Sequence, residues 1–496
     1  MPEPTEWCLV ETISDCKKDV KHEIFTPKRA TFQETPQPSP VWYLEYNTLD
    51  SRYKNYFLCI SGPTLSVYRD SQTQEKSGGS ISRLTTCPLR LSFTCNADSN
   101  GTPADMSCAC WTFMNTKERH PMVCVGGKDG TITSIDIETQ TVRFMRGHGG
   151  DVHSISAHPK YPGIIVSGSQ DHSVRLWNCI TGTCLARYHG IFGNSQQVHD
   201  VAWMDYGDAF ISCDYDRKIK LWKLSERVLD NIFNSYYYTE RQRVRKDMPG
   251  VSIPEGLPGR MKIYNEYFVA ASDALTNNSA DSLAVASNDT IVLRALTYDK
   301  SRCSATSSAI SASLCICAVL PSSTDIGKNI FRILHKYPIP TRDASLDDQV
   351  YKERRLNPDL ALSFCRIALS RTHKLLAAGN EHGDTFIWPL DPTTPVQHLR
   401  YLPPSSRISE SWYPPATTRP GDDLREDPDP APVTIRLMGQ VPIAEADRPI
   451  LLPPPEVGVG AVRSLSFHPS RLRLVVGYDC GKIAKFEFNT TAGHAN

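Results

Sequence analysis

Asp171 and His172 stand side by side, and their types are the ones that most directly suggest chemistry in this chain. They lie in the stretch SGSQDHSVRLWN, residues 167–178, ahead of an apolar run that ends at Trp177. A carboxylate that orients an imidazole is half of the machinery for general acid–base catalysis or for activating a nucleophile. The same residue types also occur in turns between strands. The surrounding sequence therefore decides between chemistry and structure.

A second copy of this pattern lies 45 residues downstream, since IVSGSQDHSVRLWN at 165–178 is echoed by FISCDYDRKIKLWK at 210–223. Each copy has an apolar strand, a turn that carries Asp, and an alternating strand that ends near Trp. The stretch GHGGDVHSISAHP at 147–159 supplies a Gly-His pair and one further strand. A period of about 40 to 45 residues with this order of features is typical of the blades of a WD-type β-propeller.

The repeat gives Asp171 a structural role. In blades of this kind, the turn Asp, the Gly-His histidine, a strand Ser and the strand-ending Trp form one hydrogen-bonded chain. Here these residues are His148, Ser167, Asp171 and Trp177. A buried indole N–H and a buried carboxylate both need partners, which this arrangement supplies. We therefore expect a structural tetrad and not a catalytic Asp171.

Weaker copies of the repeat complete the count of blades, at 41–70, 108–136, 265–296, 362–390 and 461–488. Together with the two strong copies they predict an all-β chain that folds as a seven-bladed WD40-type β-propeller over residues 29–490. A strand near Arg29–Glu34 is expected to join the last blade and close the ring. Residues 1–28 lack the period, and we expect them to form an N-terminal tail that is at least partly disordered.

Three stretches interrupt the period. Residues 225–262 predict a short helix after the fourth blade, followed by a basic cluster that is either a solvated surface or a phosphate-binding or nuclear-import signal. Residues 300–350 predict an extended insert in the sixth blade, with a strand pair and a loop. Residues 391–458 are rich in proline, since 389–460 hold sixteen of the 36 prolines. We expect this insert to be partly disordered, with one outer strand at 433–439.

Composition narrows the classes of partner. Acidic and basic residues balance at 54 each, so the formal net charge is zero and no general field attracts DNA or an anionic membrane. The sixteen cysteines are scattered without the spacing of a zinc site. No apolar run has the length of a membrane span. We therefore expect a soluble intracellular protein with no cofactor, no metal, no membrane partner and weak or no direct DNA binding.

The ordered set of phrases is more specific than a propeller alone. GHGGDVHSISAHPKYPGIIVSGSQDHSVRLWN is followed by DRKIKLWKL, LDNIFNSYYY, LLAAGNEHGDTFIWPL and AVRSLSF. This order resembles the embryonic ectoderm development / Extra sex combs family, the WD-repeat subunit of Polycomb repressive complex 2. The resemblance covers roughly residues 40–490, and the long inserts at 300–350 and 391–458 mark a divergent member.

The resemblance implies a non-catalytic scaffold in the nucleus. Members of the family hold an Enhancer of zeste-like SET-domain methyltransferase, together with other Polycomb subunits, in a complex that modifies the histone H3 tail. One face of the propeller is wrapped by a helix of that enzyme. The other face reads trimethyl-lysine with an aromatic cage, because ring faces attract a quaternary ammonium that cannot donate hydrogen bonds.

Carried over by position, the aromatic cage is reduced in this chain. When the family is aligned with this chain at VWYLEYN, the first cage aromatic corresponds to Trp42. When it is aligned at MSCACWTF, Ser107 stands where the family has Tyr. Alignment through LSFCRIAL places Ser363 and Phe364 where the family has Trp and Tyr. Trp42 and Phe364 are thus the candidate aromatic residues of a methyl-lysine cage. Ordinary packing of these two rings at the rim of the propeller is an equally good interpretation. A lost ring weakens cation binding by about tenfold, at roughly 0.5–2 kcal/mol per ring.

Two other classes of function remain at this point. A WD-repeat adaptor of another complex, such as a ubiquitin ligase or a signalling scaffold, is the alternative, because a propeller alone does not choose its partner. An enzyme is disfavoured, since the sequence contains no GxSxG elbow, no P-loop and no HExxH motif.

Overall fold

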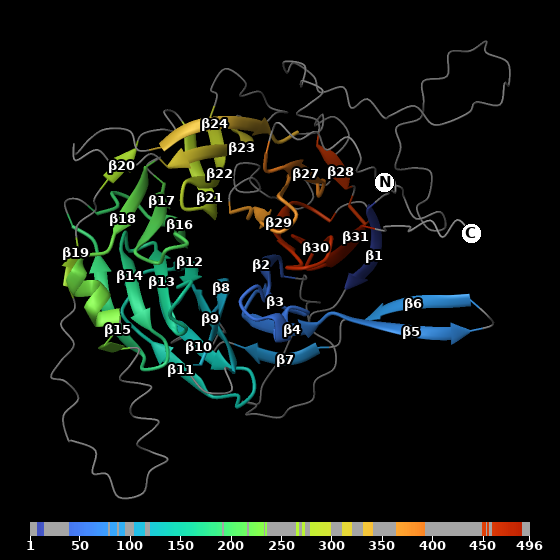
Figure 1. Cartoon of the computed structure of the whole chain (residues 1–496), viewed down its shortest axis with the longest axis horizontal. Helices are drawn as coiled ribbons and strands as arrows, with labels where there is room; N and C mark the ends of the chain where they lie inside the picture. Colours follow the sequence, from blue (N-terminus) through green and yellow to red (C-terminus); the bar gives the residue numbers. More distant parts are fainter. Residues whose placement is uncertain are drawn as a thin grey trace, which may run out of the picture.

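The computed structural model places seven β-sheets as blades around one axis (Figure 1). It describes residues 7–13, 39–77, 80–86, 89–94, 104–114, 120–190, 193–215, 218–232, 234–235, 264–266, 270–272, 278–298, 310–319, 331–340, 364–391, 449–452, 454–455 and 459–488. The fold is therefore the seven-bladed β-propeller that the repeat predicts.

Each blade is an antiparallel meander whose first strand lies nearest the axis. Blade 1 consists of β2 (Val41–Tyr46), β3 (Tyr56–Ser61), β4 (Thr64–Arg69) and β7 (Leu89–Thr94). Blade 2 consists of β8 (Met106–Phe113), β9 (Pro121–Gly127), β10 (Ile132–Asp136) and β11 (Val142–Met145). Blade 3 consists of β12 (Val152–Ala157), β13 (Ile164–Ser169), β14 (Val174–Asn178) and β15 (Thr183–Tyr188).

The remaining blades follow the same order around the ring. Blade 4 consists of β16 (Val198–Trp203), β17 (Ala209–Asp214), β18 (Ile219–Lys223) and β20 (Ala270–Ser272). Blade 5 consists of β21 (Asn278–Ser287), β22 (Thr290–Tyr298), β23 (Ile310–Val319) and β24 (Phe331–Pro338). Blade 6 consists of β25 (Ala368–Ser370), β26 (Leu375–Gly379), β27 (Thr385–Pro389) and β28 (Ile450–Leu452). Blade 7 consists of β29 (Val462–Phe467), β30 (Arg473–Tyr478), β31 (Ile483–Phe488) and β1 (Trp7–Ile13).

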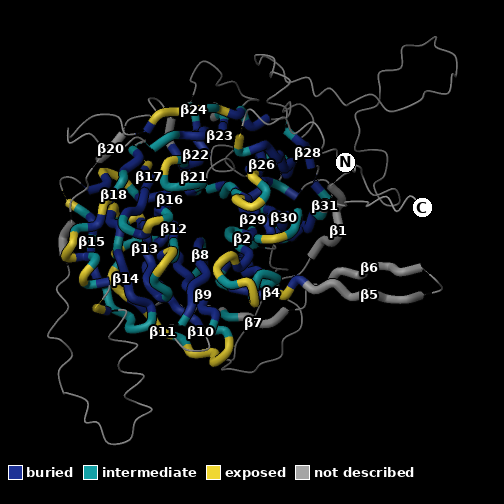
Figure 2. The backbone as a smooth tube through the Cα atoms, in the orientation of Figure 1, coloured by how far each residue is buried: buried dark blue, intermediate teal, exposed yellow. Residues whose placement is uncertain are grey.

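The hydrophobic core is divided among the interfaces between blades. Seven clusters of buried side chains lie one at each interface, including the interface that joins blade 7 to blade 1. Figure 2 shows buried residues running through the blades, with exposed residues mainly at the loops and the rim. Because both faces of each sheet are buried against a neighbour, the ring is stabilised mainly by these seven contacts.

A close approach between neighbouring blades recurs around the ring. A Cβ on Gly168 of blade 3 would lie 2.6 Å from Cγ1 of Val198, at the start of blade 4. A Cβ on Gly477 of blade 7 would lie 2.4 Å from Cγ1 of Val41, at the start of blade 1. Only glycine fits these two positions, because a real side chain cannot approach a neighbour so closely. The same packing rule therefore closes the ring.

The closing strand differs from the prediction. β1 (Trp7–Ile13) pairs antiparallel with β31 and completes blade 7. The strand predicted near Arg29–Glu34 lies outside the described residues, and the tail expected at 1–28 contains β1. The error arose because a strand of seven residues has no repeat of its own, so period alone could not locate it. The principle of closure by an N-terminal strand was correct, and its position was wrong.

The boundaries of the middle blades also differ from the repeat assignment. Residues 264–272, expected to begin the fifth blade, form the short β19 (Tyr264–Glu266), which pairs parallel with β15 of blade 3, and β20 of blade 4. β23 and β24 (Figure 1), expected in the sixth blade within 300–350, are the outer strands of blade 5. Because of the long insertions between strands, the repeat assignment gave one pair of strands to the wrong blade. The sequence alone does not show which blade an inserted strand joins.

The inserts are only partly described. The predicted helix is present at 226–232 and 234–235, where it lies between the third and fourth strands of blade 4 and not after that blade. Its Val228 and Ile232 pack into the core between blades 3 and 4. The basic cluster at 241–246 and the outer strand expected at 433–439 lie outside the described residues, and β28 is the fourth strand of blade 6. A hairpin of β5 (Ser71–Ser77) and β6 (Ser80–Thr86) extends away from blade 1 (Figure 1).

Candidate functional site

A set of β-bulges builds the candidate site at one end of the axis. The first strands of six blades each carry one extra residue near their start, and these residues are Trp42, Ser107, His153, His199, Asp281 and Arg463. A bulge re-aims the side chain of the extra residue and is common beside functional sites. We refer to these six residues as the bulge ring. Two members, Trp42 and Ser107, are positions that the sequence also assigns to the cage.

Trp42 is covered by a cation of the protein itself. The guanidinium carbon of Arg463 lies 5.3 Å from the centroid of the Trp42 ring. Arg463 is held in place by Asp479, with Nε 2.5 Å from Oδ1 and Nη2 3.1 Å from Oδ2. Both side chains of this ion pair are buried, at 5% and 7% exposure. Since the guanidinium already makes the cation–π contact, this face of Trp42 is occupied.

Phe364 reaches the site across the axis from blades 3 and 4. It precedes the first strand of blade 6, yet its ring lies 5.5 Å from His153 of blade 3 and 5.1 Å from His199 of blade 4. The φ angle of Phe364 is 59°, a left-handed conformation that is unusual for a bulky side chain. Such backbone conformations concentrate at functional sites, where the surrounding contacts hold them.

Arg366 connects three of the blades across the axis. Its Nη1 lies 2.9 Å from Oδ1 of Asp200 in blade 4, and its Nη2 donates to the carbonyl oxygen of His153 in blade 3. Its guanidinium carbon lies 5.7 Å from the ring centroid of Tyr43 in blade 1. Asp200 in turn accepts from the Leu283 backbone N–H at 2.7 Å. These contacts fix the backbone beside Phe364 and neutralise the arginine.

The two predicted serine positions have different outcomes. Ser107 donates its hydroxyl to the carbonyl oxygen of Val152 at 2.8 Å, so it ties blade 2 to blade 3. Ser363 lies outside the described residues. Trp42 and Phe364, the two candidate rings, therefore have different neighbours within the described chain: a charged arginine for the first and two imidazoles for the second.

Burial keeps the imidazoles of this site neutral. Desolvation lowers the pKa of His199 to about 4, with a further lowering by His153 and Arg366. Burial also lowers the pKa of His153, against the effects of its bond to Val198 and of nearby Asp151. Burial raises the pKa of Tyr43 well above its usual value. Around neutral pH, the Phe364 side of the site thus presents uncharged aromatic surfaces.

Sequence reasoning missed His153, His199 and Arg463 as members of this site. The signal was present, because each follows a valine at the start of a first strand, in the same register as Trp42 after Val41. Two copies read Val-His, at 152–153 and 198–199. None of the three stands at an aromatic cage position of the family, and the bulges that bring these residues together cannot be recognised from a residue pattern alone.

The four residues of the predicted tetrad contact one another in blade 3. His148 Nδ1 lies 2.9 Å from Asp171 Oδ2, and its Nε2 lies 2.7 Å from Ser167 Oγ. Trp177 Nε1 donates to Ser167 Oγ at 2.9 Å. Because a carboxylate only accepts, Nδ1 of His148 carries the proton and Ser167 donates to Nε2. His172 is exposed, with a φ of 65°, so the partner of Asp171 is His148 and not its neighbour in sequence.

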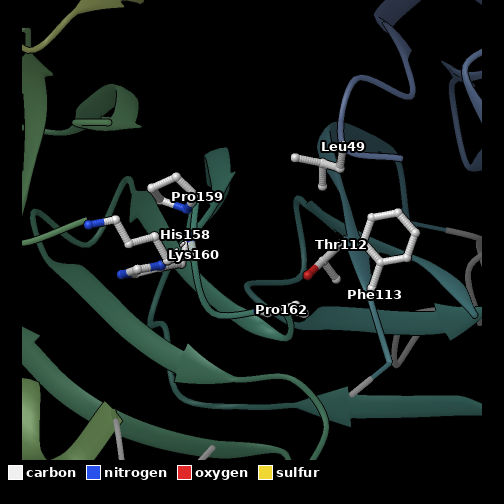
Figure 3. A pocket seen from close by; sticks show the side chains of 7 residues that line it. All are labelled: Leu49, Thr112, Phe113, His158, Pro159, Lys160 and Pro162. Atoms are coloured by element: carbon white, nitrogen blue, oxygen red, sulfur yellow. Dashed lines mark hydrogen bonds between the residues drawn. The ribbon is translucent and has the colours of Figure 1, made fainter. Parts of the chain in front are cut away.

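The other end of the axis carries an open pocket (Figure 3). It is lined by Leu49, Thr112, Phe113, His158, Pro159, Lys160 and Pro162. His158 is committed to structure, since Nε2 contacts Gly207 O at 2.9 Å and Nδ1 accepts two backbone N–H groups. Burial lowers the pKa of His158 to about 4. The described lining of this pocket therefore holds no arrangement for acid–base chemistry.

Among the described residues, no group of three or more His, Cys, Asp and Glu side chains is placed to hold a metal ion. The described helix is neither long nor apolar enough to cross a membrane. The described cysteines are thiols that form no disulfide bond with one another, and most of them are buried.

Comparison with known proteins supports the repeat. A family profile described as "WD domain, G-beta repeat" matches residues 139–178 and 182–223. The chain is 22% identical to Polycomb group protein FIE1 of Oryza sativa subsp. japonica over 373 residues, which cover 74% of this chain and 65% of that protein. It is 31% identical to Polycomb protein esc of Drosophila virilis over 170 residues, 34% of this chain and 40% of that protein. The matched region thus spans less than two thirds of these relatives.

Solved structures share the fold. A chain of a humanized mutant of the Chaetomium thermophilum Polycomb Repressive Complex 2 superposes with a TM-score of 0.59 and 16% identity, over 97% of both chains. The same complex in an apo, autoinhibited state gives a TM-score of 0.59 and the same coverage. At this level of identity, the likeness supports the propeller architecture along nearly the whole chain.

Proposed function

We propose that this chain is a relative of the Polycomb WD-repeat proteins esc and FIE, which it resembles, and that it is a non-catalytic scaffold subunit of a complex that methylates histone H3. The observation that carries the proposal is the alignment with a Polycomb protein over 74% of the chain. The complex acts on chromatin, so the chain is placed in the nucleus. Its partners are an Enhancer of zeste-like SET-domain subunit and other Polycomb subunits.

In this proposal, the two ends of the axis bind different partners. The bulge ring receives the histone H3 tail, with Phe364 as the available aromatic ring and Trp42 behind Arg463. The opposite end holds the methyltransferase subunit. Leu49, 44% exposed, lines the pocket there, and Tyr206, 65% exposed, lies under Lys160 at 5.8 Å. Exposed apolar and aromatic side chains around a pocket suit the anchoring residues of a partner helix.

Co-expression of the full chain with an Enhancer of zeste-like subunit tests the scaffold role. We expect the two proteins to elute together and the assembled complex to methylate histone H3. The double variant Leu49→Asp, Tyr206→Asp places charge on the docking end and should abolish co-elution. Phe144→Asp is the matched control, because Phe144 is 46% exposed on β11, the outer strand of blade 2.

Outcomes of this experiment separate the proposal from its alternative. Recovery of ubiquitin-ligase or signalling subunits from nuclear extract, with no SET-domain protein, would favour an adaptor of another complex. Normal assembly by the Leu49, Tyr206 variant would place the enzyme elsewhere on the propeller. Loss of assembly by Phe144→Asp as well would indicate general damage to the fold, which thermal melting would detect.

A further inference from the structure

The first strands of neighbouring blades are joined by a repeated pair of hydrogen bonds. Between blades 3 and 4, the Trp203 backbone N–H donates to Ser156 Oγ at 3.4 Å, and the Trp203 indole N–H donates to the Ser156 carbonyl oxygen at 3.1 Å. Between blades 1 and 2, the Trp111 backbone N–H donates to Glu45 Oε2 at 3.3 Å, and the Trp111 indole N–H donates to the Glu45 carbonyl oxygen at 3.0 Å. We refer to this second pair of bonds as the Glu45 bridge. Its carboxyl group takes the place of the serine hydroxyl.

Serine also joins the first strands of blades 7 and 1. The Leu44 backbone N–H donates to Ser464 Oγ at 2.8 Å, and the Tyr46 backbone N–H donates to Ser466 Oγ at 2.9 Å. A serine hydroxyl stays uncharged across the working pH range, whereas a carboxyl group gains a charge when it ionises. The Glu45 bridge is therefore a contact between blades whose strength depends on pH, unlike its serine counterparts.

The surroundings of Glu45 favour its neutral form. Its side chain is partly buried between β2 and β8, where Tyr43 of its own strand and Cys110 of β8 are the titratable groups that act on one another with it. Its partner on β3 is the apolar Leu58. Burial raises the pKa of the Glu45 carboxyl to about 8, against a lowering by the Trp111 N–H. A carboxyl group with this pKa keeps its proton at neutral pH.

Basic groups on the strands that pack against β2 do not compensate a charge on Glu45. The strands β29 and β30 belong to blade 7, on the other side of β2 from Glu45, and their Arg463 and Arg473 have carboxylate partners. His468, which follows β29, stays uncharged near neutral pH because burial lowers its pKa to about 3. Arg366 lies over Tyr43 but is paired with a carboxylate of blade 4. The sequences of β3 and β8 contain no basic residue.

The Glu45 bridge lies next to the open pocket at the docking end of the axis. The chain continues from β2 to Leu49, and Trp111 is followed by Thr112 and Phe113 on β8. Leu49, Thr112 and Phe113 all line the pocket (Figure 3). The spacing of β2 and β8 therefore sets the shape of this pocket.

We propose that Glu45 is a pH-sensitive contact between blades 1 and 2, which joins them in its protonated form and loosens them, with the pocket beside them, when it ionises. A neutral carboxyl group accepts the Trp111 N–H at little cost. A carboxylate in the same place loses hydration that this one N–H does not replace. Ionisation is therefore favoured where blades 1 and 2 separate and water reaches Glu45. This inference does not depend on the partners proposed above.

Denaturant titration of the full chain between about pH 6 and 7.5 tests the inference. Glu45→Gln keeps an oxygen that accepts the Trp111 N–H and cannot ionise, and Glu45→Ser introduces the hydroxyl found between blades 3 and 4. The pKa is about 8 in the folded chain, above its ordinary value of 4.5, so between these values the folded chain keeps a proton that the unfolded chain has lost. As the pH rises, the folding equilibrium constant of the parent should fall relative to both variants, by about tenfold per pH unit.

Ser156→Ala is the matched control, because it removes a hydrogen bond between blades that does not titrate. It should lower the folding equilibrium constant by the same factor at every pH, so its profile stays parallel to that of the parent. Parallel profiles for Glu45→Gln, Glu45→Ser and the parent would overturn the inference, as would an equal change of slope in Ser156→Ala.

Amide hydrogen exchange supplies a local measurement on the same proteins. Near pH 8, the segment that contains Trp111 should exchange faster in the parent than in Glu45→Gln, because only the parent places a charge between blades 1 and 2. Equal exchange of this segment in the two proteins would contradict the loosening that we propose.

Discussion

The two aromatic residues that the sequence assigns to one cage lie in opposite environments. Trp42 lies against Arg463, whose charge is fixed by buried Asp479. Phe364 lies against the neutral imidazoles of His153 and His199. One ring is thus covered by a cation of the protein, and the other borders two buried, uncharged imidazoles. The presence of an aromatic side chain at a family position does not reveal whether its face is free.

Removal of the arginine that covers Trp42 has the largest expected effect on stability. Arg463→Met should lower the free energy of unfolding by about 3–5 kcal/mol, because Asp479 then keeps a buried charge whose remaining hydrogen bond among the described residues is from the Ala461 N–H at 3.2 Å. Denaturant titration of parent and variant measures the change. The double variant Arg463→Met, Asp479→Asn should recover most of the loss.

An exposed ion pair provides the control for that prediction. Lys128 and Asp105 are 2.7 Å apart, but their side chains are 64% and 40% exposed. Lys128→Met should therefore change stability by less than about 1 kcal/mol. Equal losses of stability in Arg463→Met and Lys128→Met would show that Asp479 does not hold Arg463 over Trp42. The distinction between the Trp42 and Phe364 rings would then fail.

The neutral imidazole beside Phe364 predicts a smaller change in stability, which depends on pH. His199 has a pKa of about 4, below its value in the unfolded chain of about 6.5, so the unfolded state binds more protons between these values. The stability associated with the neutral imidazole is present above about pH 6.5 and is lost as the pH falls toward 4. At pH 5 the loss is about 2 kcal/mol for this residue.

Denaturant titration at pH 7.5 and pH 5 measures this loss. His199→Leu should reduce the difference between the two pH values by about 2 kcal/mol, since leucine does not titrate. His172→Leu is the matched control, because His172 is exposed. An unchanged pH dependence in His199→Leu would mean that burial does not hold His199 neutral, and the contrast between the charged neighbour of Trp42 and the neutral neighbours of Phe364 would fail.

Much of the fold could be predicted from the sequence because the repeat is local. The turn Asp171, the strand-ending Trp177 and the Gly-His histidine His148 have types and spacing that only one blade geometry satisfies together. The Pro-rich and extended inserts carry no such spacing. The strand at Trp7–Ile13 and the assignment of β19, β20, β23 and β24 to their blades depend on pairings distant in sequence, which period alone does not fix.

The candidate site was less predictable for a different reason. Alignment located Trp42, Ser107 and Phe364, but the relation among them depends on β-bulges and on a left-handed φ at Phe364. Those features bring His199 beside Phe364 and Arg463 over Trp42. They arise from packing around the axis, so residue types in sequence order do not specify them.

The central claim is that Phe364, and not Trp42, forms the ligand-binding wall of the bulge ring. The most direct measurement is titration of a trimethylated histone H3 tail peptide into the full chain carrying Phe364→Ala or Trp42→Ala, with thermal melting to verify folding. We predict that Phe364→Ala weakens binding by about tenfold, within the range of one aromatic wall, and that Trp42→Ala changes it by less than about twofold. An equal or larger loss in Trp42→Ala would contradict the account.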